Sequence, residues 1–160
     1  MMPDTPMRAF WVARGADRLG ELHGLGIGVL SFKVSTKDSY GALLVIELAH
    51  HEKGGPARHL HYEQDEWFYV VESEYVVEVG SERFRLKSGD SLFAPRKVPH
   101  AWAYVGDQPG RIVIALTPAG QLEAFLRELS KANAMAPQDP AFWRAYGMEL
   151  VGPPLAVVRS

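Results

Sequence analysis

Cysteine is absent from this sequence, which excludes disulfides and thiolate metal ligands. No apolar run approaches the roughly 20 residues that a membrane-spanning helix needs, and Met1 to Pro6 lack the basic region and apolar core of a signal peptide. Positive charge is not in excess, because 17 basic residues face 19 acidic ones, and no basic stripe suggests nucleic acid. We therefore expect a cytoplasmic protein that contacts neither membrane nor nucleic acid.

The chain has the size and composition of one globular domain, since its 160 residues are 47% apolar and 22% charged. Short apolar or β-branched segments recur between turn residues along residues 1–117, and this spacing predicts an all-β sandwich or barrel. The glycine-rich residues 15–28 are expected to form mostly loop. The expected strands are Arg8–Arg14, Val29–Val34, Tyr40–Leu48, Trp67–Val71 (a continuous apolar run, hence buried), Tyr75–Val79, Arg83–Leu86, Ser91–Ala94, Ala101–Val105 and Arg111–Thr117.

After Thr117 the period of the apolar residues changes from strand to helix. Thr117 followed by Pro118 predicts a helix start, with a capping hydroxyl and proline at the first helical position. Asp139-Pro140 predicts a second start, and residues 151–158 are expected to run extended. Residues 118–160 are therefore predicted to pack on the barrel as a helical extension of the same domain, or against a second subunit. The apolar face of the first helix comprises Leu122, Phe125, Leu126 and Leu129.

Two stretches carry residues with metal-binding chemistry. His59 and His61 point to the same side of a strand, because side chains alternate between its faces. Glu66 follows across a polar turn and opens the next strand, and His100 comes from a separate segment fixed by nearby prolines. Three imidazoles and one carboxylate that converge inside a barrel would bind a first-row transition metal. The metal is open among iron, manganese, nickel, copper, cobalt and zinc.

The remaining histidines are read without a metal. His50 and His51 flank a polar turn, and His23 lies among glycines with no partner in view, so none of the three is assigned a role. Trp67, Phe68 and Tyr69 are interpreted first as core and barrel wall. The alternative to a metal centre is a barrel that has kept the pattern of His59, His61, Glu66 and His100 without the metal.

These stretches resemble the two conserved motifs of the cupin superfamily. Every metal-ligand position matches, whereas Ser73 and Lys97 stand where the family has turn glycines and Tyr104 stands where it has asparagine. The whole sequence is similar to quercetin 2,3-dioxygenase-like cupins, including the helical tail. The first motif reads Gly54 or Gly55, His59, His61, Glu66 and Ser73; the second reads Gly89, Pro95, Lys97, His100 and Tyr104.

The resemblance implies a double-stranded β-helix, or jelly-roll barrel, with one divalent transition metal in its mouth and a homodimer formed through strand edges. It makes Glu66 both a ligand and the candidate general base toward a substrate hydroxyl. We expect Phe68, Trp102 and Tyr104 to contact the substrate, although Trp102 and Tyr104 fit the barrel wall equally well. Lys97 in place of glycine suggests a less strained turn.

The implied activity is that of a metal-dependent dioxygenase or related oxidoreductase on a small aromatic or enolic substrate that chelates through oxygen. Two other hypotheses use the same ligands. One is an isomerase, lyase or hydrolase that works without O₂. The other is a module that binds metal and a small ligand without catalysis.

Overall fold

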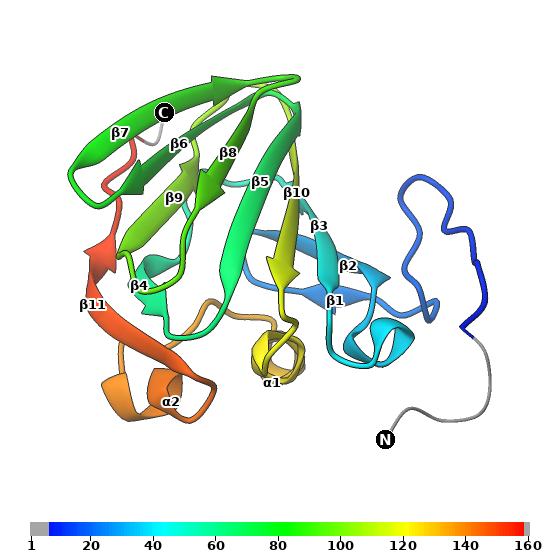
Figure 1. Ribbon diagram of the computed structural model, residues 1–160. Coiled ribbons are helices and arrows are strands. Elements are labelled where there is room, and N and C mark those ends of the chain that lie inside the picture. The colour runs from blue at the N-terminus through cyan, green and yellow to red at the C-terminus, as the bar shows by residue number, and fades with distance from the viewer. Residues whose placement is uncertain (1–6, 159–160) are drawn as a thin grey trace.

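The computed structural model describes residues 7–158, and in this range two antiparallel sheets form a flattened barrel (Figure 1). The sheet that includes the amino-terminal strands has the order β1-β2-β3-β10-β5-β8. Its strands are β1 His23–Gly24, β2 Gly28–Val34, β3 Leu44–His50, β10 Gly110–Thr117, β5 Asp65–Glu72 and β8 Ser91–Ala94. The other has the order β11-β4-β9-β6-β7, with β11 Met148–Pro154, β4 Ala57–His61, β9 His100–Tyr104, β6 Glu74–Val79 and β7 Glu82–Lys87. The predicted all-β jelly-roll fold is thereby confirmed.

Alternation along the strands builds the core. On β3, Leu44, Ile46 and Leu48 are buried while the residues between them are partly exposed. Ile46 lies opposite Ile114 of β10, so apolar side chains of neighbouring strands meet on the inner face. Burying one such side chain contributes about 1.5–3 kcal/mol to folding, so this inner layer is the main source of stability.

The continuous apolar run predicts that Trp67–Val71 is buried throughout, and this prediction is wrong. Phe68 is fully buried, but Trp67 and Tyr69 are 40% and 37% exposed. Their rings stack on each other at 5.8 Å between centroids on the outer face of the sheet. Only one face of this sheet meets the core, so the strand alternates even though every residue in the run is apolar.

The expected amino-terminal strand is also wrong. Residues 8–14 form no strand, and β1, which lies inside the predicted loop, pairs with β2 through His23 and Leu30. The amide of Phe32 donates to the carboxylate of Asp17 at 2.7 Å, and its carbonyl accepts from the amide of Arg18 at 2.7 Å. These bonds occupy the backbone groups that an additional strand would need for pairing.

The carboxyl-terminal extension contains two helices at one end of the barrel (Figure 1). Helix α1 spans Leu122–Ala132 and therefore begins later than the predicted Thr117-Pro118 start. Thr117 instead ends β10, and the amide of Ala119 donates to the carbonyl of Gly41 at 2.9 Å, which holds this segment in a connection. Helix α2 spans Pro140–Arg144 and begins at the predicted Asp139-Pro140 cap. The extended tail begins earlier than predicted, as β11, and pairs with β4.

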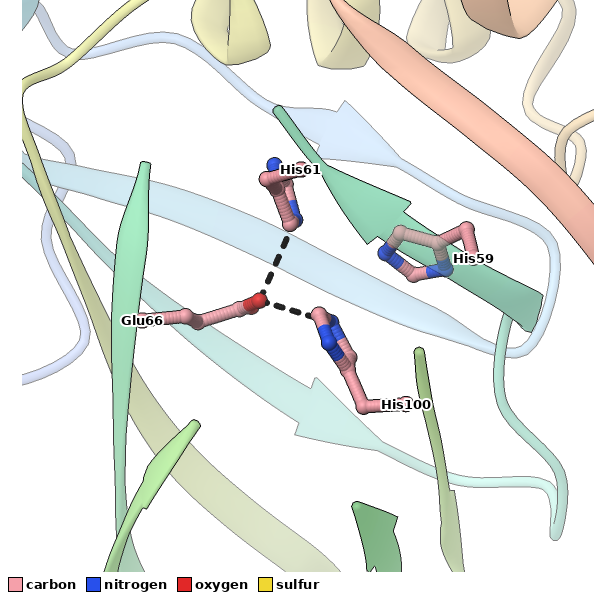
Figure 2. A group of neighbouring side chains, drawn as sticks. All are labelled: His59, His61, Glu66 and His100. Atoms are coloured by element: carbon pink, nitrogen blue, oxygen red, sulfur yellow. Dashed lines mark ion pairs between the residues drawn. The ribbon is translucent and has the colours of Figure 1, made fainter. Parts of the chain in front are cut away.

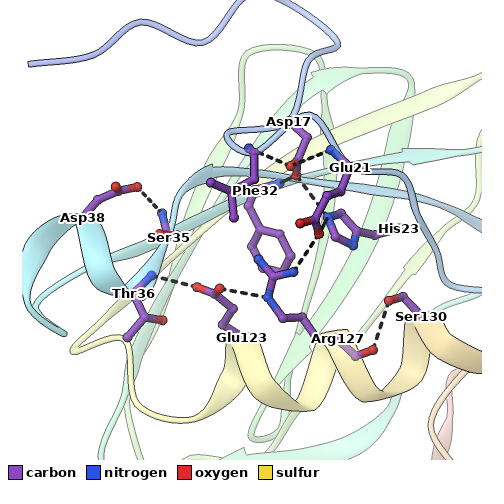
Figure 3. A network of polar contacts seen from close by, with 11 residues as sticks. Asp17, Glu21, His23, Phe32, Ser35, Thr36, Asp38, Glu123, Arg127 and Ser130 are labelled. Atoms are coloured by element: carbon purple, nitrogen blue, oxygen red, sulfur yellow. Dashed lines mark hydrogen bonds and ion pairs between the residues drawn. The ribbon is translucent and has the colours of Figure 1, made fainter.

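A polar network holds the outer side of α1 against the amino-terminal loop and the 3₁₀ helix η1, Thr36–Ser39 (Figure 3). Arg127 donates to Glu123 at 3.0 Å and to Glu21 at 2.9 Å, and the other oxygen of Glu123 accepts from the amide of Thr36 at 2.7 Å. The guanidinium also lies 4.7 Å from the centre of the Phe32 ring. The apolar face of α1 is consequently turned into the barrel, as its spacing predicts. No helix in residues 7–158 is long and apolar enough to cross a membrane.

The two positions where the sequence lacks a turn glycine keep a glycine-like backbone. Ser73 has φ 70° and Lys97 has φ 67°. The amide of Val98 bonds to the carbonyl of Pro95, so Lys97 is the third residue of a tight turn, where φ is positive in type II geometry. The expectation of a less strained turn is wrong, because the chain must reverse here to place His100 and the lysine carries the strain.

We expect Lys97→Gly to raise the free energy of unfolding by up to about 1 kcal/mol. Removing the side chain relieves roughly 1–2 kcal/mol of left-handed strain, and greater freedom in the unfolded chain returns about 0.4–1 kcal/mol of this. Lys97→Ala keeps the strain and serves as the control, with little change expected. Urea unfolding measures both, and a less stable glycine variant would contradict the assignment of strain to this residue.

Candidate metal centre

Four side chains from three strands meet inside the barrel. His59 and His61 lie on β4, Glu66 is the second residue of β5, and His100 begins β9 directly opposite His59. One ligand atom from each residue lies within 4.8 Å of the others. Figure 2 shows the three rings and the carboxylate turned toward a common point. The predicted convergence of residues from distant parts of the chain is therefore present.

The path of the chain explains why they meet. β4 belongs to one sheet and β5 to the other, and residues 62–64 make the crossing between them. Glu66 therefore faces His61 from across the interior instead of lying beside it on a hairpin. His59 and His61 share the inward face of β4, since the residues between and beside them are only partly buried.

The centre is buried, and three of the polar atoms that face its common point lack hydrogen-bond partners within the described protein. The four residues are between 1% and 5% exposed. Glu66 Oε2 lies 3.1 Å from His61 Nε2 and 2.8 Å from His100 Nε2, yet none of these three atoms makes a hydrogen bond of acceptable geometry. Buried polar atoms without partners are rare in folded proteins. A cation at their common point would satisfy all of them.

The outward nitrogens of the rings do have partners. His59 Nδ1 lies 2.6 Å from the carbonyl oxygen of Ala57, and His61 Nδ1 lies 2.9 Å from the side-chain oxygen of Gln64. His100 Nδ1 approaches the carbonyl oxygen of Val98 at 3.4 Å. An oxygen acceptor at Nδ1 places the proton there and leaves the lone pair on Nε2, which is the form that binds a metal.

Electrostatics keep His59 neutral and Glu66 ionised, as metal binding requires, whereas His61 must first lose a proton. Burial raises the pKa of Glu66, but the neighbouring His100 and His61 lower it by more than burial raises it. The net pKa of Glu66 therefore lies well below the ordinary value. Burial, together with the charges of His100 and His61, lowers the pKa of His59 well below its usual value. Burial lowers the pKa of His61, and the carboxylate of Glu66 outweighs this and raises it overall. Glu66 is thus anionic near neutral pH, and metal binding would release a proton from His61.

This donor set suits one divalent transition metal. Three imidazole nitrogens and one carboxylate oxygen, without sulfur, fit iron, manganese, nickel, copper, cobalt or zinc. The residues that could hold the ion are His59, His61, Glu66 and His100.

A cavity of about 80 Å³ adjoins His59, His61 and Glu66. This is several times the roughly 10–15 Å³ that a single water needs. Within the described chain its wall contains neither lysine nor arginine, and the polar residues on it are His50, His59, His61 and Glu66. The apolar wall comes from both sheets, from the apolar face of α1 and from α2, with Ile46, Ile114, Trp102, Phe125, Leu126 and Trp143 among its members.

The predicted substrate contacts lie in different places. Trp102 lines the cavity. Phe68 packs behind it, with its ring 6.2 Å from His100, and is not among the residues that line the cavity in the described chain. Tyr104 is also outside the lining, because its ring stacks on His50 at 5.7 Å and its hydroxyl donates to the carbonyl of Gln108.

Two wall residues were not anticipated from the sequence. His50 continues the inward series of β3, lines the cavity and lies 2.8 Å through Nδ1 from the hydroxyl of Tyr75. The alternation along β3 was the signal that could have identified it. Trp143 is 1% exposed, and its ring lies 4.8 Å from that of His59. No pattern in the sequence indicates that a residue from α2 reaches the metal ligands.

We expect His59→Ala and His100→Ala to lose bound metal, because each removes a nitrogen ligand. The affinity should fall by more than the roughly 10–100-fold that loss of a ligand's supporting partner costs. His51→Ala is the matched control, since the side chain of His51 is 60% exposed. Elemental analysis after dialysis measures the stoichiometry, and either ligand variant with full metal content would contradict the assignment.

Stability should depend on pH through His50. Burial, followed by the charge of His51, lowers the pKa of His50 from 6.5 to about 4. As pH falls from 6.5 toward 4, the unfolded chain takes up a proton that the folded protein does not, so stability is lost in this window and is fully present above it. The loss attributable to His50 is about 3 kcal/mol.

His50→Gln should flatten this part of the pH dependence, whatever its effect on stability at pH 7. Urea unfolding of metal-free protein at several pH values tests the difference between the variant and the parent chain. Parallel curves for parent and His50→Gln would contradict the lowered pKa.

Comparison with known proteins agrees with this architecture. Residues 44–116, from β3 through β10, match the family model described as the cupin domain. An uncharacterized protein of Methanocaldococcus jannaschii is 32% identical over 60 residues, or 38% of this chain and 48% of that protein. The tetracenomycin polyketide synthase protein TcmJ of Streptomyces glaucescens is 35% identical over 78 residues, or 49% of this chain and 51% of its own. The chain spans about half the length of these curated relatives.

A solved structure of an RmlC-like cupin from Shewanella frigidimarina has a TM-score of 0.53 at 22% identity, and the match covers 70% of this chain and 92% of that one. Identity at this level shows a shared fold and carries no conclusion about the reaction. The matched domain contains all four residues of the metal centre. Residues 44–116 therefore match a cupin domain, and the fold shared with a solved cupin agrees with that match.

Proposed function

We propose that this protein is a metal-dependent enzyme that acts on a small, neutral, aromatic or enolic molecule and binds it through oxygen. The reaction favoured by the sequence resemblance is dioxygenation. The single observation that carries the proposal is the cavity beside His59, His61 and Glu66, whose wall is apolar except for His50 and these three residues.

The lining argues for a neutral substrate. A carboxylate or phosphate held in a dry cavity needs a cationic partner, and the described lining residues include neither lysine nor arginine. Phe125 and Trp143 offer ring faces and edges against which a planar molecule can pack. The polar end of the substrate would then lie toward Glu66 and the histidines, which is the only polar side of the wall apart from His50 in the described structure.

Glu66 is the candidate base. Its carboxylate is ionised near neutral pH, which is the state required to accept a proton from a phenol or enol, and its lowered pKa means that the hydroxyl must itself be made more acidic. When bound, a divalent ion supplies Lewis acidity, which makes such a hydroxyl easier to deprotonate. Trp143 and the apolar face of α1, which forms the roof of the cavity, place apolar side chains around the same space.

The likeness to a tetracenomycin polyketide synthase protein supports this substrate class. Polyketide chains and the rings made from them are rich in enols, phenols and β-diketones. The same likeness favours a second candidate, because ring closures and isomerisations of such molecules need no O₂. In that case the protein is a metal-dependent isomerase, lyase or hydrolase with the same ligands. A module that only binds metal and ligand is the third reading, and the homodimer stays a prediction.

The proposal is tested with protein loaded with each of the six candidate metals. Flavonols, catechols and β-diketones are compared with oxalate and sugar phosphates, and turnover is followed both with an oxygen electrode and under anaerobic conditions. Neutral chelating molecules should bind and react, whereas the anionic ones should not. Glu66→Gln should lower turnover per bound metal by at least about 100-fold, while Glu63→Gln, which alters an exposed carboxylate nearby, should not.

Each outcome separates the candidates. Oxygen uptake stoichiometric with product supports the dioxygenase, and equal turnover without oxygen supports the second candidate. Tight binding of the same neutral molecules without turnover supports the binding module. Preference for the anionic compounds, or metal-free protein that binds none of the ions, would contradict the proposed function.

A further inference from the structure

Gln64 is a buried amide that lies between the metal centre and the roof. It sits at the end of the crossing from β4 to β5 and is 6% exposed. Its Oε1 atom lies 2.9 Å from His61 Nδ1, and its Nε2 atom donates to the carbonyls of Ala119 at 2.6 Å and Pro118 at 3.1 Å. An interior amide with every polar end engaged is held in one orientation.

The partners decide which way the amide faces. Two backbone carbonyls can only accept hydrogen bonds, so the end of the amide beside Pro118 and Ala119 must be the NH₂ group. The oxygen then faces His61, and because it can only accept, the proton of that ring must sit on Nδ1. This leaves the lone pair of His61 Nε2 directed at Glu66 and the centre.

His61 differs in this respect from the other two histidines. His59 and His100 face backbone oxygens two residues away on their own segments, at Ala57 and Val98. The partner of His61 is the side chain of Gln64, which also donates hydrogen bonds to the carbonyls of residues 118–119. These residues lie just before α1. The orientation of one metal ligand is thus tied to the start of the roof.

Gly120 gives Gln64 the space that this arrangement needs. It has φ 55°, and a Cβ built on it would lie 2.8 Å from both Cδ and Nε2 of Gln64. Such a contact is too close for any real Cβ, and the amide cannot move aside without breaking its bonds to the carbonyls. A larger residue at this position would therefore push Gln64 away from His61.

We propose that Gln64 is a positioning residue, which fixes the proton of His61 on Nδ1 and couples that ligand to the turn that begins the cavity roof. The effect of Gln64 on metal binding rests on the proposed metal-dependent function, whereas the hydrogen bonds of Gln64 do not depend on it. It follows that opening of the roof at residues 118–120 loosens His61, so that access to the cavity and the strength of metal binding change together.

The first measurement uses metal-free protein at a pH high enough for His61, whose pKa is raised, to be neutral. Nitrogen-15 NMR of the imidazoles distinguishes a ring protonated on Nδ1 from one protonated on Nε2. The parent chain should show His61 in the Nδ1 form, and Gln64→Leu, which keeps the bulk of the side chain without its polar atoms, should show a mixture. Gln121→Leu is the matched control, because it changes the same residue type next to the same turn but on an exposed side chain.

The second measurement is metal affinity by competition with a chelator. Gln64→Leu should bind about 10–100-fold more weakly, as expected when a ligand loses its outer partner, and Gln121→Leu should be unchanged. Gln64→Glu separates the two roles. A carboxylate still accepts from Nδ1 but cannot donate to residues 118–119, so the proton form should survive while amide exchange at the start of α1 accelerates. Gly120→Ala should resemble Gln64→Leu in the NMR measurement.

The measurements test the positioning role of Gln64 and the proposed metal-dependent function independently of each other. If His61 keeps the Nδ1 form in Gln64→Leu and affinity changes less than twofold, the positioning role is wrong. If Gln64→Leu does not fold, Gln64→Glu and Gly120→Ala decide. The positioning role is also wrong if His61 keeps the Nδ1 form in Gly120→Ala and amide exchange at the start of α1 is unchanged in Gln64→Glu. If the parent chain binds no metal, the proposed function fails, while the NMR result on metal-free protein still tests Gln64.

Discussion

The structure depends on one electrostatic constraint, which is a carboxylate buried inside the barrel. Glu66 is 4% exposed, and the only groups that compensate its charge in the described structure are the imidazoles turned toward it. An isolated buried charge is costly, so the surrounding fold must bring those rings close enough to offset it or supply a cation. The crossing between the two sheets at residues 62–64 meets this need, because it places Glu66 opposite β4 instead of beside it.

The roof follows from the same constraint. The apolar face of α1 together with Trp143 covers the candidate ligands, which strengthens electrostatic interactions there relative to those in bulk water. This face is turned inward because Arg127 and Glu123 anchor the opposite side of the helix to the amino-terminal loop and to η1 (Figure 3). The helical extension is therefore part of the cavity wall and contributes to the apolar composition of that wall.

Predictions from local sequence patterns agree with the structure where one interaction dominates the segment. The spacing of His59 and His61 places both on one face of a strand, and the apolar face of α1 follows from its helical period. Such predictions were wrong where contacts with residues far away in the sequence determine the backbone conformation. The carboxylate of Asp17 and the amide of Arg18 occupy the backbone of Phe32, so residues 8–14 form no strand. The turn before His100 forces a left-handed backbone on Lys97, although nothing in a lysine favours it.

The sequence alone therefore determined the all-β fold, the inward pair on β4 and the identity of the four candidate ligands, because each rests on strand alternation or on a motif with definite spacing. Only the tertiary structure decided that Trp102 lines the cavity while Tyr104 does not, that His50 and Trp143 reach it, and that Gln64 links His61 to the roof. The physical reason is that these contacts join segments far apart in the chain. Which residues they bring together depends on how two sheets and a helix pack, and no local pattern encodes that packing.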